Sequence, residues 1–271
     1  MMEQTDILQA DREKLSAAKR IVIKIGTSSL TYENGRTNLR RIGVLVRVIS
    51  DLMNQDKEVI LVSSGAIGIG VNTLKMAQKP STVMGRQAVA AVGQCNLMQI
   101  YAQIFSDYGY NVGQLLLTRD IINREDMRQN TVNTVEELLR LKIIPVVNEN
   151  DSVAVEEIKF GDNDNLSYVV ASITNADLLI IMTDINGYYD KNPSHPDAKL
   201  YHNIYDLSEE IEKAAGGAGS KLGTGGMLTK VHACRLAAEK GINAVIVNGQ
   251  DPRIVYDILD GKDVGTLFVA R

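Results

Sequence analysis

The stretch "EVILVSSGAIGIG" (58–70) decides the fold class, because its character changes halfway along. Residues 59–62 are apolar on both faces, as expected of a strand buried in a parallel sheet. Gly65, Gly68 and Gly70 then lead into a stretch of helical period. The pattern therefore predicts a buried strand that passes through a glycine-rich turn into a helix.

The same alternation recurs along the chain. Further strands are predicted at 20–25, 111–118, 143–148, 177–183 and 243–248, and helices at 38–55, 66–78, 81–107, 125–141, 165–175 and 226–240. This order predicts an α/β fold, a three-layer α/β/α sandwich with a mainly parallel central sheet. Pro80 is expected in the first turn of helix 81–107, and Gly241 at the C-terminal end of the last helix. Residues 187–201 are expected to form a long loop.

Size and composition exclude several classes of protein. The 271 residues are 45% apolar, which is enough for a sizeable core, and the net charge of -4 gives no basic stripe for a nucleic acid. Cys95 and Cys234 fall in helical stretches and are expected to be buried apolar residues, not disulfide or metal ligands. No apolar run approaches the ~18 residues of a membrane span, so no membrane contact and a cytoplasmic location are expected.

Two glycine-rich turns are candidates for phosphate binding. One is "SSGAIGIG" (63–70), and the other is "GSKLGTGGMLTK" (219–230), where Lys230 falls about one turn into the helix. Lys24 near the end of strand 20–25 is a third candidate ligand. The alternatives are a tight turn, a flexible linker and a lysine that merely reaches water. The first turn matches neither GxGxxG nor a P-loop.

Short polar side chains crowd "NENDS" (148–152) and "GDNDN" (161–165). Ligands of open parallel sheets bind beyond the carboxyl ends of the strands, so these residues are expected at the mouth of a crevice. They suit an ammonium group, a Mg²⁺ ion or the lysines of a phosphate site. Asp164 or Asn165 is alternatively a cap for the helix that begins near Leu166.

Six motifs in this order resemble the glutamate-phosphorylating branch of the amino acid kinase family. They are "IVIKIGTSSLT", "VSSGAIGIG", "AVGQ", "PVVNENDSVAVEEIKFGDNDNLS", "TDINGYYDKNP" and "GTGGMLTK". The resemblance covers about residues 20–268. It implies a helical N-terminal extension (1–19) and a kinase domain (20–271), with a glutamate-binding lobe at about 20–175 and an ATP-binding lobe at about 176–271. No C-terminal PUA domain, which many relatives carry, is expected.

The resemblance also implies roles for individual residues. Lys24 and Lys230 would stabilise the transferred phosphoryl group, and Asp164 would hold both lysines. The glutamate-binding positions would be Ser64, Asp151 and Asn163, supported by Asn148. The ATP-binding positions would be Lys24, Gly26, Gly65, Thr183, Asp184, Thr224, Gly225, Gly226, Met227, Leu228, Thr229 and Lys230, with no protein ligand assigned to a metal.

The implied reaction is transfer of the γ-phosphate of ATP, with Mg²⁺, to the γ-carboxylate of glutamate in proline synthesis. Proline feedback inhibition and a homo-oligomer, a dimer or tetramer, are implied as well. An N-acetylated substrate would leave Asp151 unpaired, which disfavours acetylglutamate kinase. Aspartokinase, a non-catalytic amino-acid sensor and a nucleotide-dependent oxidoreductase remain as alternatives.

Overall fold

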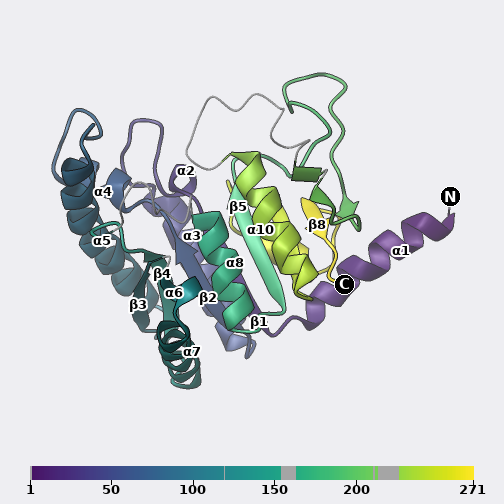
Figure 1. Cartoon of the computed structure of the whole chain (residues 1–271), viewed down its shortest axis with the longest axis horizontal. Helices are drawn as coiled ribbons and strands as arrows, with labels where there is room; N and C mark the ends of the chain where they lie inside the picture. Colours follow the sequence, from purple (N-terminus) through teal and green to yellow (C-terminus); the bar gives the residue numbers. More distant parts are fainter. Residues whose placement is uncertain (1, 119, 154–162, 210, 213–225) are drawn as a thin grey trace.

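The computed structural model describes residues 2–118, 120–153, 163–209, 211–212 and 226–271. Its centre is an eight-stranded sheet in the order β3-β4-β2-β1-β5-β7-β8-β6 (Figure 1). The strands are β1 (Arg20–Ile25), β2 (Glu58–Ser63), β3 (Val112–Leu117), β4 (Ile144–Glu149), β5 (Leu178–Thr183), β6 (Asn203–Ile204), β7 (Asn243–Asn248) and β8 (Thr266–Phe268). All neighbouring pairs are parallel except β7 with β8. The predicted, mainly parallel sheet is therefore confirmed.

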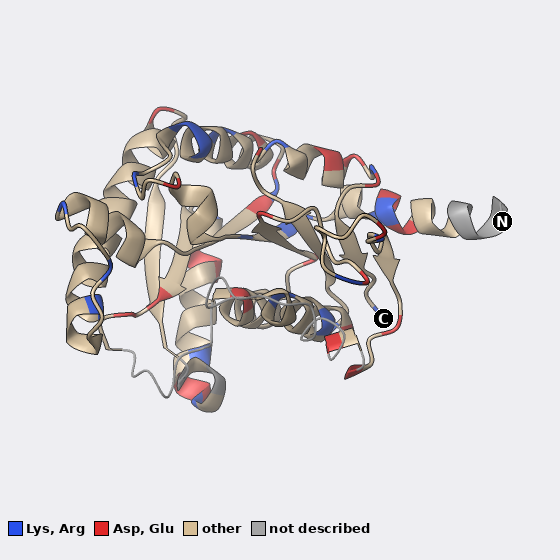
Figure 2. Ribbon diagram, turned by 90° about the horizontal axis from the view of Figure 1, so that it is seen from above, with Lys and Arg blue, Asp and Glu red and all other residues tan. Residues whose placement is uncertain are grey.

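Helices cover both faces of this sheet, as the two perpendicular views show (Figures 1 and 2). The longer ones are α1 (Met2–Glu13), α3 (Leu39–Asn54), α4 (Ala66–Thr73), α5 (Val83–Ser106), α7 (Glu125–Arg140), α8 (Asn163–Ile173) and α10 (Met227–Glu239). The shorter ones are η1 (Lys14–Ala17), α2 (Thr27–Leu30), α6 (Asp120–Asn123) and α11 (Ile254–Leu259). Figure 2 shows charges of both signs mixed over the helices and loops of the described chain.

The two faces have separate hydrophobic cores, which makes the three layers. Ile21, Ile23 and Ile25 of β1 pack with α3, α5 and α11 in one core. Val22, on the opposite face of the same strand, packs with α7, α8 and α10 in the other. The two-residue period of a strand produces this division, and it also decides which face Lys24 occupies.

Several predicted details are wrong, each for a local reason. Helix α5 begins at Val83, because the Thr82 side chain caps it by accepting from the backbone N–H of Gly85, so Pro80 lies outside the helix. Helix α4 ends at Thr73, shortly before Lys75, which has a positive φ of 52°. Cys95 is exposed, whereas Cys234 is buried as expected.

Other predicted details are confirmed. Gly241, with φ of 80°, directly follows the C-cap of α10 and donates its N–H to the carbonyl of Ala238. Residues 187–201 form a loop with one isolated bridge between Tyr189 and Leu200. The short elements β6, β8 and α11 carry too few residues for a periodic signal, and the sequence did not predict them.

The N-terminal segment is helical and is held against the far edge of the sheet. Arg12 is buried and donates to the side chain of Asn203, the first residue of β6, and to the carbonyls of His202 and Val264. Burial lowers the pKa of this guanidinium, although the nearby Asp263 carboxylate opposes the change. Figure 1 shows α1 projecting outward on the side of the molecule where β8 lies.

Candidate active site

Two lysines from distant parts of the sequence meet at one buried carboxylate. Lys24 Nζ of β1 lies 2.5 Å from Asp164 Oδ1, and Lys230 Nζ of α10 lies 3.0 Å from Asp164 Oδ2. Asp164 is fully buried, and the two lysines are only 5% and 8% exposed. Helix α8 begins at Asn163, so Asp164 belongs to its first turn and does not cap it from outside. The alternative role of Asp164 as a helix cap is therefore wrong.

The charges of this triad (Lys24, Asp164 and Lys230) explain why it is stable and what it attracts. At about 3 Å and an effective dielectric of about 20, each ammonium group gains roughly 5 kcal/mol of Coulomb attraction to the carboxylate. Without Asp164, the two buried ammonium groups would lose the carboxylate between them and would repel each other. The triad still carries one net positive charge, although the whole chain carries -4. The triad therefore favours an anion.

Helix α10 supplies a further contact to the same carboxylate. Thr229 Oγ1 donates to Asp164 Oδ2 at 2.8 Å, which the sequence analysis did not anticipate for this residue. Cys234 lies one turn later on α10, where burial raises the pKa of its thiol well above the usual value. The Asp164 carboxylate raises this pKa further, and Lys230 opposes it. The thiol therefore stays protonated and is not a candidate nucleophile.

The turns that follow β1 and β2 lie beside the triad. A Cβ on Gly26 would be 3.8 Å from Lys24 Nζ, so the backbone after β1 passes close to the ammonium group. Gly65 begins α4 with φ of 97°, a conformation that favours glycine. The N–H of Ser64 donates to the carbonyl of Ile25 and joins the two turns. Both predicted glycine positions thus lie at the carboxyl edge of the sheet.

Three of the predicted amino-acid-binding residues, Ser64, Asn163 and Asn148, are connected by hydrogen bonds. Asn163 Nδ2 donates to Ser64 Oγ at 2.9 Å and to Asn148 Oδ1 at 2.8 Å. Asn148 Nδ2 donates to Gln94 Oε1 at 2.8 Å. Asp151 lies in the turn directly after β4.

Gln94 is the member of this network to which the sequence analysis gave no role, although it ends the "AVGQ" motif. A single glutamine in an otherwise apolar helical stretch is also the pattern of an ordinary surface residue. The structure buries it because α4 and α5 approach so closely that a Cβ on Gly93 would lie 1.7 Å from the carbonyl oxygen of Ala66.

The remaining predicted ATP positions divide into described and undescribed residues. Thr183 ends β5 beside β1, and its hydroxyl donates to Asp184 Oδ1 at 3.1 Å. Gly226 is the N-cap of α10, and the next four residues, 227–230, form the first turn of that helix. Thr224 and Gly225 lie outside the described residues, as does segment 154–162.

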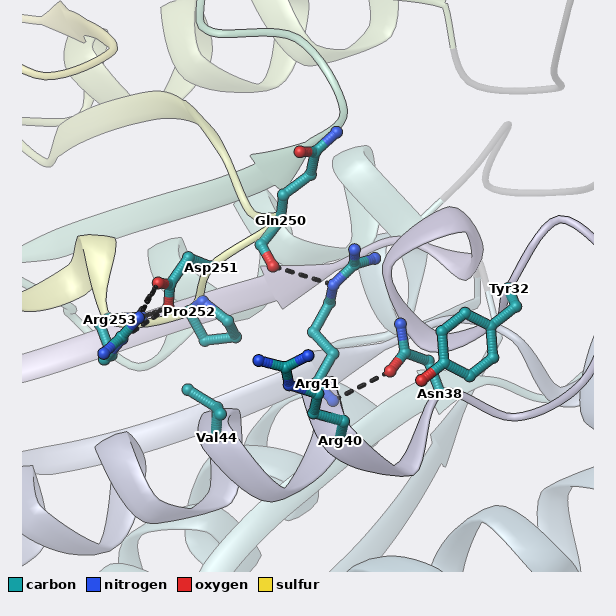
Figure 3. A pocket seen from close by; sticks show the side chains of 9 residues that line it. All are labelled: Tyr32, Asn38, Arg40, Arg41, Val44, Gln250, Asp251, Pro252 and Arg253. Carbon is teal, nitrogen blue, oxygen red and sulfur yellow. Dashed lines mark hydrogen bonds and ion pairs between the residues drawn. The ribbon is translucent and has the colours of Figure 1, made fainter.

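Arg41 of α3 ties the turn after β1 to the loop after β7. Its guanidinium donates to the carbonyl of Gln250 at 3.0 Å and to the carbonyls of Ser28 and Ser29 at 3.2 and 3.3 Å. Figure 3 shows Arg41 extended across a cavity of about 260 Å³ toward Gln250. The cavity is lined by Tyr32, Asn38, Arg40, Arg41, Val44, Gln250, Asp251, Pro252 and Arg253. This contact braces α2, the turn that begins next to Gly26.

The described residues contain no group of three or more His, Cys, Asp or Glu side chains placed to hold a metal ion. Within the same residues, no helix combines the length and the apolar character that a bilayer span requires.

The sequence profile of the amino acid kinase family matches residues 19–248. The chain belongs to this family. Among curated relatives, the chain is 53% identical to the glutamate 5-kinase of Clostridium perfringens (strain 13 / Type A), covering 96% of this chain and 98% of the relative. It is 51% identical to that of Enterococcus faecalis (strain ATCC 700802 / V583), covering 95% and 97%.

Solved structures confirm the fold at much lower identity. A carbamate kinase from Giardia lamblia bound to AMP-PNP superposes with a TM-score of 0.68 at 17% identity, covering 94% of this chain and all of that one. The UMP kinase of Bacillus anthracis gives a TM-score of 0.62 at 15% identity, covering 93% of this chain and 96% of that one. Both support the predicted amino acid kinase fold.

Proposed function

We propose that this protein is an ATP-dependent glutamate 5-kinase, which phosphorylates the γ-carboxylate of L-glutamate in the first step of proline synthesis. The observation that carries the proposal is the convergence of Lys24 and Lys230 on the buried carboxylate of Asp164. The curated relatives at 53% and 51% identity favour this function over aspartokinase, acetylglutamate kinase and a non-catalytic sensor.

The chemistry requires positioning and positive charge more than a covalent catalyst. One oxygen of the substrate γ-carboxylate forms a bond to the γ-phosphorus, while the bond from that phosphorus to the bridging oxygen breaks and ADP leaves. Two anions must therefore approach each other in line. In our proposal, Lys24 and Lys230 offset the negative charge on the transferred group. Asp164 is a positioning residue that holds both ammonium groups at that point.

The amide network suits the amino-acid end of the substrate. We propose that Ser64, Asn163 and Asp151 bind glutamate, and that Asn148 supports Asn163 through their 2.8 Å hydrogen bond. The N–H groups of a free α-ammonium group can donate hydrogen bonds to the Asp151 carboxylate. An acetylated nitrogen offers this carboxylate no charged donor, so we expect the acetylated substrate to bind more weakly, by about 1–3 kcal/mol.

ATP is proposed to bind beside the triad at the carboxyl edge of the sheet. The proposed contacts are Lys24, Gly26, Gly65, Thr183, Asp184, Gly226 and 227–230, together with Thr224 and Gly225 outside the described residues. The N-terminus of α10 and the glycine turns offer backbone N–H groups to phosphate. Mg²⁺ is proposed as the companion of ATP, because Mg²⁺ in kinases is held largely by phosphates and water. No protein ligand is assigned to it.

Other expectations from the family remain part of the proposal. These are a glutamate-binding part at about 20–175, an ATP-binding part at about 176–271, feedback inhibition by proline, a homo-oligomer and a cytoplasmic location. An oxidoreductase would need a nicotinamide nucleotide, and the proposal predicts that the protein binds ATP and not NAD(H).

A hydroxylamine trap tests the function directly. The purified protein is incubated with ATP, Mg²⁺ and hydroxylamine, which converts an acyl phosphate into a coloured hydroxamate. Glutamate, aspartate and acetylglutamate are compared at equal concentrations. We expect a hydroxamate with glutamate and ADP release at the same rate. A stronger signal with aspartate or acetylglutamate, or no signal with any of the three, contradicts the proposal.

A further inference from the structure

The Gln94 side chain is buried, and its amide oxygen is hydrogen-bonded whereas its amide nitrogen is not, within the described part of the chain. It is 8% exposed, and its carbonyl oxygen accepts from Asn148 Nδ2 at 2.8 Å. Its own nitrogen, Nε2, is buried with no hydrogen-bond partner among the residues that the structure describes. A buried, unpaired N–H lowers stability, so a glutamine at this position is not explained by packing.

The direction of the network is fixed by a backbone group. The N–H of Glu149 can only donate, and it donates to Asn148 Oδ1 at 2.8 Å. The oxygen of the Asn148 amide is therefore identified, and its nitrogen must be the atom that faces Gln94. Gln94 must then present its carbonyl, because two facing N–H₂ groups would repel. This sequence of donors and acceptors explains why Nε2 of Gln94 does not pair with Asn148.

The same order determines what the opposite end of the network offers. Asn163 Nδ2 donates to Asn148 Oδ1, to the carbonyl of Ser63 and to Ser64 Oγ. Because its nitrogen is fully used, the Asn163 side chain has its carbonyl left to accept a hydrogen bond. Because Ser64 Oγ accepts from Asn163, its own proton remains to be donated. An amino acid supplies the matching partners, an ammonium group and a carboxylate.

We propose that Gln94 is a positioning residue that fixes the donor and acceptor order of the amino-acid subsite through Asn148. It acts by its side-chain carbonyl, three hydrogen bonds away from Ser64, and does not touch the substrate. The inference rests on the proposed function, because it takes glutamate as the ligand of this subsite. The close approach of α4 and α5 at Gly93 holds the neighbouring Gln94 in place.

Two variants separate the carbonyl from the rest of the side chain. Gln94→Met keeps the shape but removes the acceptor, so we expect the KM for glutamate to rise about tenfold, as for the loss of one hydrogen bond. The KM for ATP should not change. Gln94→Glu keeps an oxygen opposite Asn148, and its KM for glutamate should stay within about threefold of the wild-type value.

The melting temperature distinguishes positioning from a structural role. Gln94→Met removes one unpaired buried N–H group and creates another on Asn148, so its melting temperature should stay near that of the wild type. The matched control is Gln99→Met, which changes an exposed glutamine on the same helix and should alter neither KM. A structural role would lower the melting temperature and leave both KM values unchanged.

The results separate this inference from the proposed function. If the wild-type protein forms no glutamate-dependent hydroxamate, both the proposed function and this inference are wrong. An active wild type with an unchanged glutamate KM in Gln94→Met defeats the inference alone. The same holds if Gln94→Glu raises this KM tenfold or more, a result that can be read even if the methionine variant fails to fold.

Discussion

Replacing Lys230 with methionine should remove most of the turnover and little of the stability. Lys230 Nζ lies 3.0 Å from Asp164, so a phosphoryl oxygen that contacts it at ~4 Å gains about 4 kcal/mol at an effective dielectric of ~20. Part of this attraction already exists in the bound substrate before the reaction, and only the part gained in the transition state raises kcat. We therefore expect kcat to fall by roughly two to three decades, the usual loss for one preorganised donor.

The structure also predicts that this variant folds. Asp164 keeps Lys24 at 2.5 Å, so its buried charge remains compensated after the substitution. The melting temperature should fall by only a few degrees, about 2–4 °C for each kcal/mol in a chain of this size.

The assay is hydroxamate formation at saturating glutamate and ATP, with circular dichroism as the test of folding. Lys240→Met is the control, because this lysine is exposed at the end of the same helix. A folded Lys230→Met protein with kcat within about threefold of the wild type would refute the role of the lysine pair.

Three further predictions concern stability. Asp164→Asn removes the carboxylate that lies between two buried ammonium groups and should lower the free energy of unfolding by about 3–5 kcal/mol in urea titrations; a loss below about 1 kcal/mol would contradict this. Gly93→Ala places a Cβ against the Ala66 carbonyl and should cost about 1–3 kcal/mol in the same titration, whereas an unchanged midpoint would mean that the helices separate freely. Partial burial raises the pKa of Glu212, but hydrogen bonds from two basic side chains of α10 lower it below the usual value overall. A lowered pKa contributes stability that is present above the unfolded-state pKa and is lost as the pH falls through the folded-state pKa. Glu212→Gln should therefore weaken the pH dependence of the free energy of unfolding below about pH 4.5. If the variant and the wild type show the same pH dependence, Glu212 makes no such contribution.

The fold was largely predictable because each buried strand carries its own signal. The six predicted strands are all present, since runs such as 58–64 and 177–183 are apolar regardless of their neighbours. The start of α8 was misplaced because Asn163 and Asp164 are typical capping residues, and the sequence does not show that they lie inside the first turn. The exposure of Cys95 was missed because a surface position on a long helix depends on what covers that helix.

The candidate site divides in the same way. The glycine turns, the lysines and the polar clusters were identified from residue type and spacing, because phosphate binding at the ends of parallel strands uses few kinds of residue. Gln94 was not identified as a site residue, because an isolated glutamine in a helix is ordinary until a neighbour buries it.

The sequence by itself determined the α/β layers and which side chains carry charge. It also determined the order along the chain of the turns that carry the candidate site residues. Only the tertiary structure decided that Lys24, Asp164 and Lys230 meet, that Thr229 joins them, and that Gln94 is enclosed with an amide nitrogen that has no partner among the described residues. The physical reason is the separation along the sequence between the residues that interact. Strand and helix patterns arise from neighbours within a few residues, whereas the charge and hydrogen-bond balance of a buried group depends on atoms brought together from separate elements.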